Sequence, residues 1–388
     1  MTSSGSCRCG RWVANAQYLQ CELQVRDNDR VTLREKVTRR RTGESLRMGA
    51  AYPRPLLMAV RPARFLVVLL VALLAGCGGD DDAGSATAPA EPPIDATLLL
   101  DFAPNAVHSG IYAATHRGLD RKAGIDLRVQ APTASTDAVR LLLAGRAQLA
   151  VLDIHDLAIA RERGRDLVGV MAIVQRPLAA VLADSSIRRP RDLEGRRVGV
   201  TGLPSDDAVL TSIVRGDGGD PAAVRSTTIG FNAVASVVSG RVAGATAFWN
   251  VEGVALHERM PDAREFRVDD FGAPAYPELV VTVARRTLQQ DTDLVRRAVH
   301  ALVSGYGVVD RDPEGALRDL VAGAPDVDPA EAQRQLDALG DAFGSGDGIG
   351  ELDPQRLRAW AAWEVRFGIV EHRPDVDAAF DASFLPDG

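Results

Sequence analysis

From residue 97 onward, short runs rich in leucine and β-branched residues alternate with longer stretches in which apolar residues recur at helical spacing. This alternation predicts an α/β protein with mainly parallel sheets. The expected strands are 97–102, 126–130, 149–153, 167–174, 178–183, 197–201, 226–230, 245–248, 265–268 and 279–284. The expected helices are 109–118, 136–144, 155–163, 233–239 and 251–258, with a helical tail at 293–310, 313–321, 329–343 and 354–367.

The α/β pattern occurs twice, which predicts two lobes and agrees with a length of 388 residues. We expect residues 96–180 and 284–388 to form the first lobe and residues 181–283 to form the second. The chain should cross between the lobes near 178–183 and near 279–284. A cleft between two such lobes is a common ligand site, and hinge closure then traps the ligand.

Residues 58–76 have the pattern of an export signal. A start that contains arginine precedes the apolar residues 65–74, which are too few to span a bilayer comfortably, and residues 74–77 read LAGC. This ending resembles the bacterial lipobox, in which the cysteine is lipidated and becomes the first mature residue. We therefore expect Cys77 to anchor the mature protein on the extracytoplasmic side of a membrane. The alternative for this segment is a buried core helix.

The segments on either side of this signal are not expected to fold. Residues 77–95 are rich in Gly, Asp, Ser, Ala and Pro, which cannot bury apolar surface, so they predict a flexible tether. Residues 1–57 precede a complete signal, and we interpret them as an upstream extension from a mis-assigned start, with Met58 as the initiator. A metal site at Cys7, Cys9 and Cys21 would lack a fourth ligand and the spacing of a zinc module.

Charge and composition exclude several classes of chemistry. The first 64 residues are basic although the whole chain carries a net charge of −7, so the remainder is acidic and a nucleic-acid groove is not expected there. Lys36 and Lys122 are the only lysines, which nearly excludes Schiff-base chemistry. All 4 cysteines lie at or before residue 77, so a later disulfide, thiolate metal site or catalytic thiol is excluded. We expect no cofactor and no metal.

Polar and aromatic side chains gather where the expected strands end, which is where open α/β sheets place the loops that contact ligands. Such side chains follow the first strand, the third strand and one strand of the second lobe. The candidates are Asp101, Phe102, Asn105, His108, Tyr112, Asp153, His155, Trp249 and Glu252. The residues alone leave two alternatives open, a capped turn at 101–112 and a core tryptophan at 249.

The loop GLPSDD at 202–207 has the form of a helix start, with Ser205 expected as the N-cap and two aspartates in the first turn. The positive end of a helix can hold a phosphate. Here Asp206 and Asp207 already occupy that favourable field, so a neutral ligand is favoured over a dianion.

Five segments of the chain are shared with one family. They read DFAPNAVHSGIYAA, LLLAGRAQLAV, DLEGRRVGVTGLPSDDAVL, FWNVEGVAL and FRVDDFGAPAYPELVVTVARRTL. In this order they resemble the solute-binding proteins of ABC transporters, in the branch that binds the thiamin precursors formylaminopyrimidine and hydroxymethylpyrimidine. The resemblance covers about residues 98–371. It implies a two-lobed, type II periplasmic-binding-protein-like fold that delivers its ligand to an ABC permease and ATPase.

The resemblance also implies roles for the candidate residues. The ligand would be a planar aminopyrimidine, stacked on Trp249 and Tyr276, with Phe102 standing where relatives often have Trp. Glu252 and Asn105 would bind its polar edge. The second candidates for polar contacts are Asp101, His108, Asp153 and His155.

Other functions stay open beside this one. Hydroxymethylpyrimidine phosphate synthases have the same fold, with a pyridoxal-phosphate lysine four residues before a histidine and a cysteine-rich iron motif. If His155 matches that histidine, the lysine position is Val151, and residues 273–279 contain no cysteine, so we expect no enzyme. The remaining alternatives are a binder of alkanesulfonate, nitrate or another heterocycle, and an adhesion or sensor lipoprotein.

Overall fold

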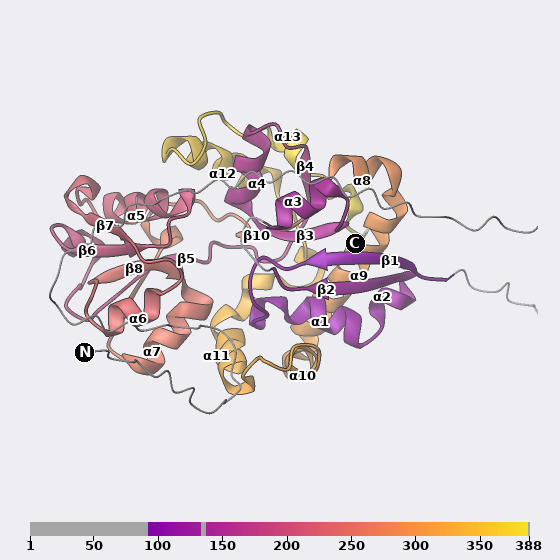
Figure 1. Cartoon of the computed structure of the whole chain (residues 1–388), viewed down its shortest axis with the longest axis horizontal. Coiled ribbons are helices and arrows are strands. Elements are labelled where there is room, and N and C mark those ends of the chain that lie inside the picture. The colour runs from indigo at the N-terminus through magenta and orange to yellow at the C-terminus, as the bar shows by residue number, and fades with distance from the viewer. Residues whose placement is uncertain (1–91, 133–136, 387–388) are drawn as a thin grey trace, which may run out of the picture. The chain divides into compact units, whose positions relative to one another are not determined.

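The computed structural model describes residues 92–132 and 137–386, which belong to one compact unit (Figure 1). The predicted export signal, Cys77 and most of the predicted tether lie outside the described residues. Among the helices that are described, none combines the length and the apolar character needed to cross a membrane.

The first sheet has five strands in the order β2-β1-β3-β10-β4. β1 pairs in parallel with β2 and β3, whereas β10 runs antiparallel to β3 and β4. β4 and β10 are buried at every position, although β10 lies inside the sheet and β4 lies at its edge. The strands are β1 (Ile94–Leu99), β2 (Ile125–Gln130), β3 (Leu149–Asp153), β4 (Leu167–Ala172) and β10 (Leu279–Ala284).

The second sheet repeats this plan with five strands in the order β7-β6-β8-β5-β9. β6 is parallel to β7 and β8, and β5 is antiparallel to β8 and β9. Both sheets are therefore mixed, which corrects the expectation of mainly parallel sheets while the α/β, two-sheet class is confirmed. The strands are β5 (Ala179–Ala183), β6 (Arg197–Val200), β7 (Arg225–Thr228), β8 (Gly244–Phe248) and β9 (Arg264–Arg267).

Two connections join the sheets (Figure 1). Residues 173–178 lead from β4 to β5, and residues 272–278 precede β10. The sequence pattern placed the crossings at the strands near 178–183 and 279–284, whereas the connections directly precede β5 and β10. β10 pairs within the first sheet, although the expected boundary at 283 assigned nearly all of it to the second lobe.

Most helices lie where the sequence predicted them, whereas the short helices α2, α8 and α13 were not expected. The helices are α1 (Ser109–His116), α2 (Leu119–Lys122), α3 (Asp137–Ala144), α4 (Ile154–Glu162), α5 (Pro204–Gly216), α6 (Ala233–Val238), α7 (Val254–Arg259), α8 (Arg285–Gln290), α9 (Thr292–Arg311), α10 (Pro313–Gly323), α11 (Pro329–Leu339), α12 (Pro354–Arg366) and α13 (Val376–Ala379). α1 packs closely on α9 because Gly305 has no side chain. A Cβ atom at this position would lie 2.1 Å from the carbonyl oxygen of Gly110.

Three helices of the C-terminal tail, α10, α11 and α12, begin in the same way. Each has an aspartate at the N-cap, whose side chain accepts hydrogen bonds from first-turn backbone N–H groups, and a proline directly after it. Proline fits there because the first helical N–H has no partner within the helix. These starts fix α11 and α12, the two tail helices that supply side chains to the sites described below.

The start of α5 differs from the prediction. Ser205 is not the N-cap, because the helix begins at Pro204 and Leu203 precedes it. Asp206 caps this end instead: its Oδ2 accepts hydrogen bonds from the backbone N–H groups of Gly202 and Leu203, at 2.7 and 2.8 Å, and also from the hydroxyl of Thr201. A carboxylate in the first turn of α5 therefore binds the backbone of the two residues that precede the helix.

Candidate functional site

The loop after β1 is held by a short chain of hydrogen bonds. Asn105 Oδ1 accepts from the N–H of Val107 at 3.0 Å, and the N–H of Asn105 donates to His108 Nδ1 at 3.2 Å. His108 Nε2 lies 2.8 Å from Asp101 Oδ1. Since Nδ1 is the acceptor, Nε2 carries the proton that Asp101 accepts. The structure thus brings Asp101, Asn105 and His108 together, with His108 fully buried.

A pocket of about 180 Å³ lies against this loop. Phe102 and Asn105 line one side, and Val251, after β8, and the segment from α10 into α11 line the rest. Three carboxylates line it and none of its described lining residues is basic, so we call it the acidic pocket. The lining residues are Phe102, Ala103, Pro104, Asn105, Val251, Asp326, Val327, Asp328, Glu331, Ala332 and Gln335.

The two amide side chains of this pocket are already fixed by the protein. Asn105 Nδ2 donates to the carbonyl of Ala103 at 3.0 Å. Gln335 Oε1 accepts from the N–H of Ala106 at 3.2 Å, and its Nε2 donates to Glu331 at 3.3 Å. Because Gln335 belongs to α11, far along the chain, sequence reasoning gave no signal for it or for the neighbouring carboxylates.

The loop after β8 forms a π-helical turn, Trp249–Gly253, a conformation that often occurs at functional sites. Trp249 is 1% exposed: its Nε1 donates to the carbonyl of Pro177 at 2.9 Å, and the Arg267 guanidinium lies 3.9 Å from the ring centroid. Its indole is thus occupied by protein contacts.

Two neighbours of Trp249 keep partial exposure, Glu252 in the same turn and Phe248 at the end of β8. Glu252 accepts from the N–H of Phe248 at 3.3 Å, and burial raises the pKa of the Glu252 carboxyl. Phe248 is half-buried and packs against both hydrophobic cores. The alternation of β8 could have indicated this ring, since neighbouring strand residues point to opposite faces.

A second hollow, of about 470 Å³, lies beside Trp249 between α7, β9 and α11. Its charged side chains pair with one another: Arg267 donates to Glu265 at 2.7 Å, and Arg334 forms an ion pair with Glu258. Since these charges are satisfied within the protein, this hollow offers a ligand fewer free groups than the acidic pocket.

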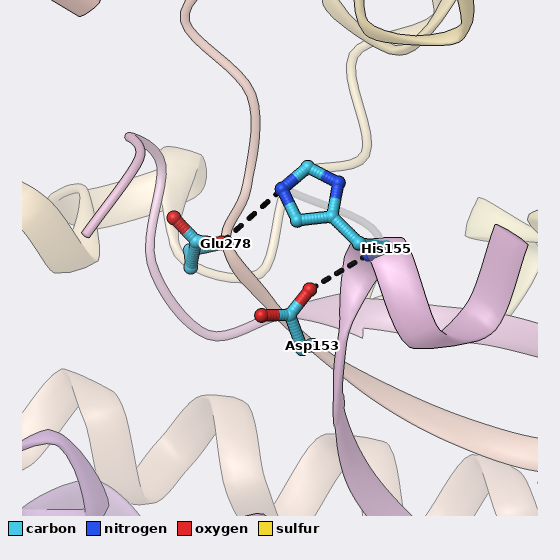
Figure 2. Close-up of side chains that lie close together, drawn as sticks. All are labelled: Asp153, His155 and Glu278. Atoms are coloured by element: carbon cyan, nitrogen blue, oxygen red, sulfur yellow. Dashed lines mark hydrogen bonds and ion pairs between the residues drawn. The ribbon is translucent and has the colours of Figure 1, made fainter. Parts of the chain in front are cut away.

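A buried polar cluster lies beside the connections between the sheets. His155 Nδ1 is hydrogen-bonded to Glu364 of α12, and Nε2 lies 3.2 Å from the hydroxyl of Tyr276 and 3.6 Å from Glu278 Oε1. Asp153 Oδ1 accepts from the N–H of His155 at 2.7 Å. In Figure 2 one dashed line joins Glu278 to the imidazole of His155, and another joins Asp153 to the backbone nitrogen of His155.

The protonation of this cluster follows from its carboxylates. Burial opposes a charged imidazole, but Glu364, Asp153 and Glu278 outweigh it and raise the pKa of His155 to about 10. Burial also raises the pKa of the Asp153 and Glu278 carboxyls.

The same cluster contains a possible metal-ligand set. One ligand atom from each of Asp153, His155 and Glu278 lies within 4.8 Å of the others, and imidazole with two carboxylates can bind a divalent cation. A metal would have to displace the imidazole proton, which the raised pKa of His155 holds firmly at neutral pH.

Other predicted residues lie apart from the acidic pocket. Tyr276 is fully buried, with its ring centroid 5.8 Å from that of Trp363. Tyr112 is 7% exposed and packs on α10, where a Cβ atom at Gly323 would lie 2.4 Å from its ring. Ser205 lies in the first turn of α5. The predicted residues in or bonded to the pocket wall are thus Phe102, Asn105, His108 and Asp101.

Comparison with known proteins agrees with this architecture. Residues 105–316 match the model of the family described as NMT1/THI5 like. The formylaminopyrimidine-binding protein of Halalkalibacterium halodurans is 32% identical over 227 residues, which are 58% of this chain and 69% of that protein. A 4-amino-5-hydroxymethyl-2-methylpyrimidine phosphate synthase of Legionella pneumophila is 23% identical over 236 residues, 60% of this chain and 74% of that protein.

Solved structures confirm the fold class. The alkanesulfonate-binding protein of Xanthomonas axonopodis pv. citri, bound to MOPS, matches with a TM-score of 0.60 at 18% identity, over 76% of this chain and 100% of that chain. The two-sheet arrangement is therefore that of type II periplasmic binding proteins, as the resemblance predicted.

Proposed function

The chain belongs to the NMT1/THI5-like family, and we propose that it binds an uncharged or weakly basic aminopyrimidine of the formylaminopyrimidine or hydroxymethylpyrimidine type. The observation that carries this proposal is the acidic pocket beside Phe102 and Asn105. The 32% identical relative from Halalkalibacterium halodurans, a formylaminopyrimidine-binding protein, supports the same ligand class.

The chemistry of the pocket fits such a ligand. A planar ring can stack on Phe102, which contributes ~0.5–1.5 kcal/mol beyond area burial. Ligand amino groups can donate to the carboxylates of Asp326, Asp328 or Glu331. The amide of Asn105 can complement a ring nitrogen, so the lining can distinguish an aminopyrimidine from a purely apolar ring.

The wider predicted site remains part of this proposal. Glu252 and the partly exposed Phe248 offer a carboxyl and a ring on one loop. Trp249 and Tyr276 could contact the ligand only if the hinge connections opened, because both are buried as they stand. The further predicted contacts are Asp101, His108, Tyr112, Asp153, His155 and Ser205.

The N-terminal sequence and the family support a proposed cellular role. A lipidated Cys77 would hold the protein on the extracytoplasmic face of a membrane, with the tether allowing it to reach an ABC permease and its ATPase. The ligand would then be delivered for import. This role rests on the LAGC motif and the polar stretch after it.

A binding role is favoured over catalysis. The synthases among the relatives would need a lysine where this chain has Val151, if His155 corresponds to their histidine, and a cysteine-rich motif where 273–279 has none. We therefore propose that the chain binds a pyrimidine without converting it.

Isothermal titration calorimetry on the purified protein tests the ligand class. The panel contains formylaminopyrimidine, hydroxymethylpyrimidine, thiamin, an alkanesulfonate and nitrate. We expect the pyrimidines to bind, and at 100 times the dissociation constant they should add about 2.7 kcal/mol to the free energy of unfolding. Tight binding of the sulfonate or nitrate, with no pyrimidine binding, would reject the proposal.

A pair of variants locates the binding to the pocket. Asp326→Asn removes a lining carboxylate and should weaken the pyrimidines several-fold. Asp310→Asn, on α9 and not among the residues that line the pocket, is the matched control and should leave affinity unchanged. Equal behaviour of the two variants would show that the ligand binds elsewhere.

A further inference from the structure

Large exposed apolar side chains are few among the described residues, and half of them lie at one kind of position. Phe102, Leu203 and Phe231 follow the C-terminal ends of β1, β6 and β7, where α/β proteins bind ligands. The complete set is Ile94, Phe102, Leu203, Phe231, Val238 and Val365. Single exposed apolar residues are common on protein surfaces, so only the two members of this set that contact each other support an inference.

The two aromatic members of this set contact each other. Phe102 is 38% exposed and Phe231 is 57% exposed, and their ring centroids lie 5.9 Å apart with an interplanar angle of 51°. This distance and tilt are within the range of favourable aromatic pairs. Because Phe102 follows a strand of the first sheet and Phe231 a strand of the second, the contact joins the two sheets at their ligand-facing ends.

The backbone around Phe231 presents the ring to solvent. Gly230 adopts a φ of +59°, which turns the chain sharply after β7, and Asn232 Nδ2 donates to the carbonyl of Ile229 at 3.1 Å before α6 begins. Ile229 on the other side of the turn is 8% exposed. The turn thus buries one apolar residue and leaves Phe231 free to meet Phe102.

We propose that Phe231, through its contact with Phe102, closes the mouth of the acidic pocket and slows the escape of the bound ligand. This inference rests on the proposed function, since Phe102 lines the pocket and Phe231 is not among the described lining residues. Phe231 is therefore a positioning residue: it acts on the ligand by holding the Phe102 ring and by tying the second sheet to the first.

The expected effect is kinetic. Loss of one aromatic contact should raise the dissociation rate constant about 2- to 12-fold, which corresponds to ~0.5–1.5 kcal/mol. The association rate constant should change less than twofold, because removing the contact leaves the pocket itself intact. A residue needed only for folding would not separate the two rate constants in this way.

Stopped-flow kinetics with formylaminopyrimidine as the probe tests the inference. Phe231→Ala should release the probe faster, and Phe231→Tyr, which keeps the ring, should restore slow release. Val238→Ala is the matched control, because Val238 is also an exposed apolar residue close to Phe231 in the sequence. It is 44% exposed and lies at the end of α6. Equal dissociation rates for Phe231→Ala and Val238→Ala would overturn the inference.

A ligand-free measurement tests the contact separately. A double-mutant cycle of Phe102→Ala and Phe231→Ala in urea unfolding should give a coupling of about 2- to 12-fold in the unfolding equilibrium constant. No coupling would overturn the contact itself. If the wild-type protein binds no pyrimidine, the proposed function and the role of Phe231 in it both fail, whereas normal binding with unchanged release rejects Phe231 alone.

Discussion

Replacing Glu278 should show how strongly one carboxylate holds the two connections together. Glu278 is fully buried at the end of the second connection, and its Oε2 accepts from the N–H groups of Leu178 and Ala179, at 2.6 and 3.1 Å, where the first connection enters β5. Its Oε1 has no hydrogen-bond partner among the described residues and faces His155. The Glu278 side chain thus bonds the end of the second connection to the start of β5.

The magnitude follows from the two donors. Glu278→Leu leaves two buried N–H groups without acceptors, at ~1–3 kcal/mol each, so the free energy of unfolding should fall by ~2–6 kcal/mol. Glu278→Gln keeps an oxygen that both N–H groups can reach and loses only the charge of the acceptor. We expect Glu278→Gln to lower the free energy of unfolding by less than half as much as Glu278→Leu does.

Urea unfolding of the two variants, followed by circular dichroism, separates these cases. The slope of the free energy against urea should stay constant, which shows that only stability has changed. If Glu278→Leu lowered the free energy of unfolding by less than ~1 kcal/mol, the hydrogen bonds to Leu178 and Ala179 would not contribute as argued. Equal losses for Leu and Gln would assign the effect to the charge near His155 instead.

The remaining predictions concern charge, ligand and anchor. The folded protein holds the His155 proton with a pKa of about 10 against an ordinary 6.5, so its stabilising contribution is complete below the lower value. Stability should then fall by up to ~1.4 kcal/mol per pH unit between the two values, and His155→Gln should flatten this slope in thermal melts. Arg267→Gln should cost ~0.5–2 kcal/mol in urea unfolding by uncovering the Trp249 ring. Glu252→Gln should weaken amine-bearing pyrimidines by ~1–3 kcal/mol in calorimetry and leave analogues without the amine unchanged. Cys77→Ser should release the protein from membranes, as cell fractionation would show.

The strands could be predicted from sequence, but their partners could not. The runs 178–183 and 279–284 are apolar except for Thr282 and show no alternation, so periodicity does not say which sheet each one joins. In the structure β5 pairs with β8 and β9, and β10 with β3 and β4. These pairings join segments roughly 65–130 residues apart, and only tertiary packing determines them.

The site was predictable where it depended on local sequence. Asp101, Asn105 and His108 lie within one loop after a strand, and their mutual hydrogen bonds follow from that proximity. The exposure of Trp249 was not predictable, because a tryptophan fits a core as well as a binding surface and its cover comes from Arg267 on another strand.

The residues that sequence reasoning missed come from distant helices. Glu364 reaches His155 from α12, and Asp326 and Gln335 reach the pocket from the α10–α11 region. Glu364 and Gln335 lie in helices and Asp326 lies in the loop between α10 and α11, and none of them belongs to a motif. Charged residues at such positions usually face solvent, so only the packed structure shows which of them face a site.

Charge, rather than fold, separates the candidate ligands of this chain. The fold is shared with an alkanesulfonate-binding protein at 18% identity, so the fold alone does not indicate the ligand of this chain. A sulfonate or nitrate stays negative at neutral pH. At 4 Å from a carboxylate, such an anion would be repelled by ~1 kcal/mol at the dielectric constant of water and by ~4 kcal/mol at the effective dielectric constant near a protein surface. The described lining of the acidic pocket offers no cation to offset this repulsion. The arginines nearby, Arg267 and Arg334, are paired with Glu265 and Glu258. Under the proposed function, an aminopyrimidine would bring N–H donors to the same carboxylates, so we expect the acidic lining to favour the heterocycle over the anion.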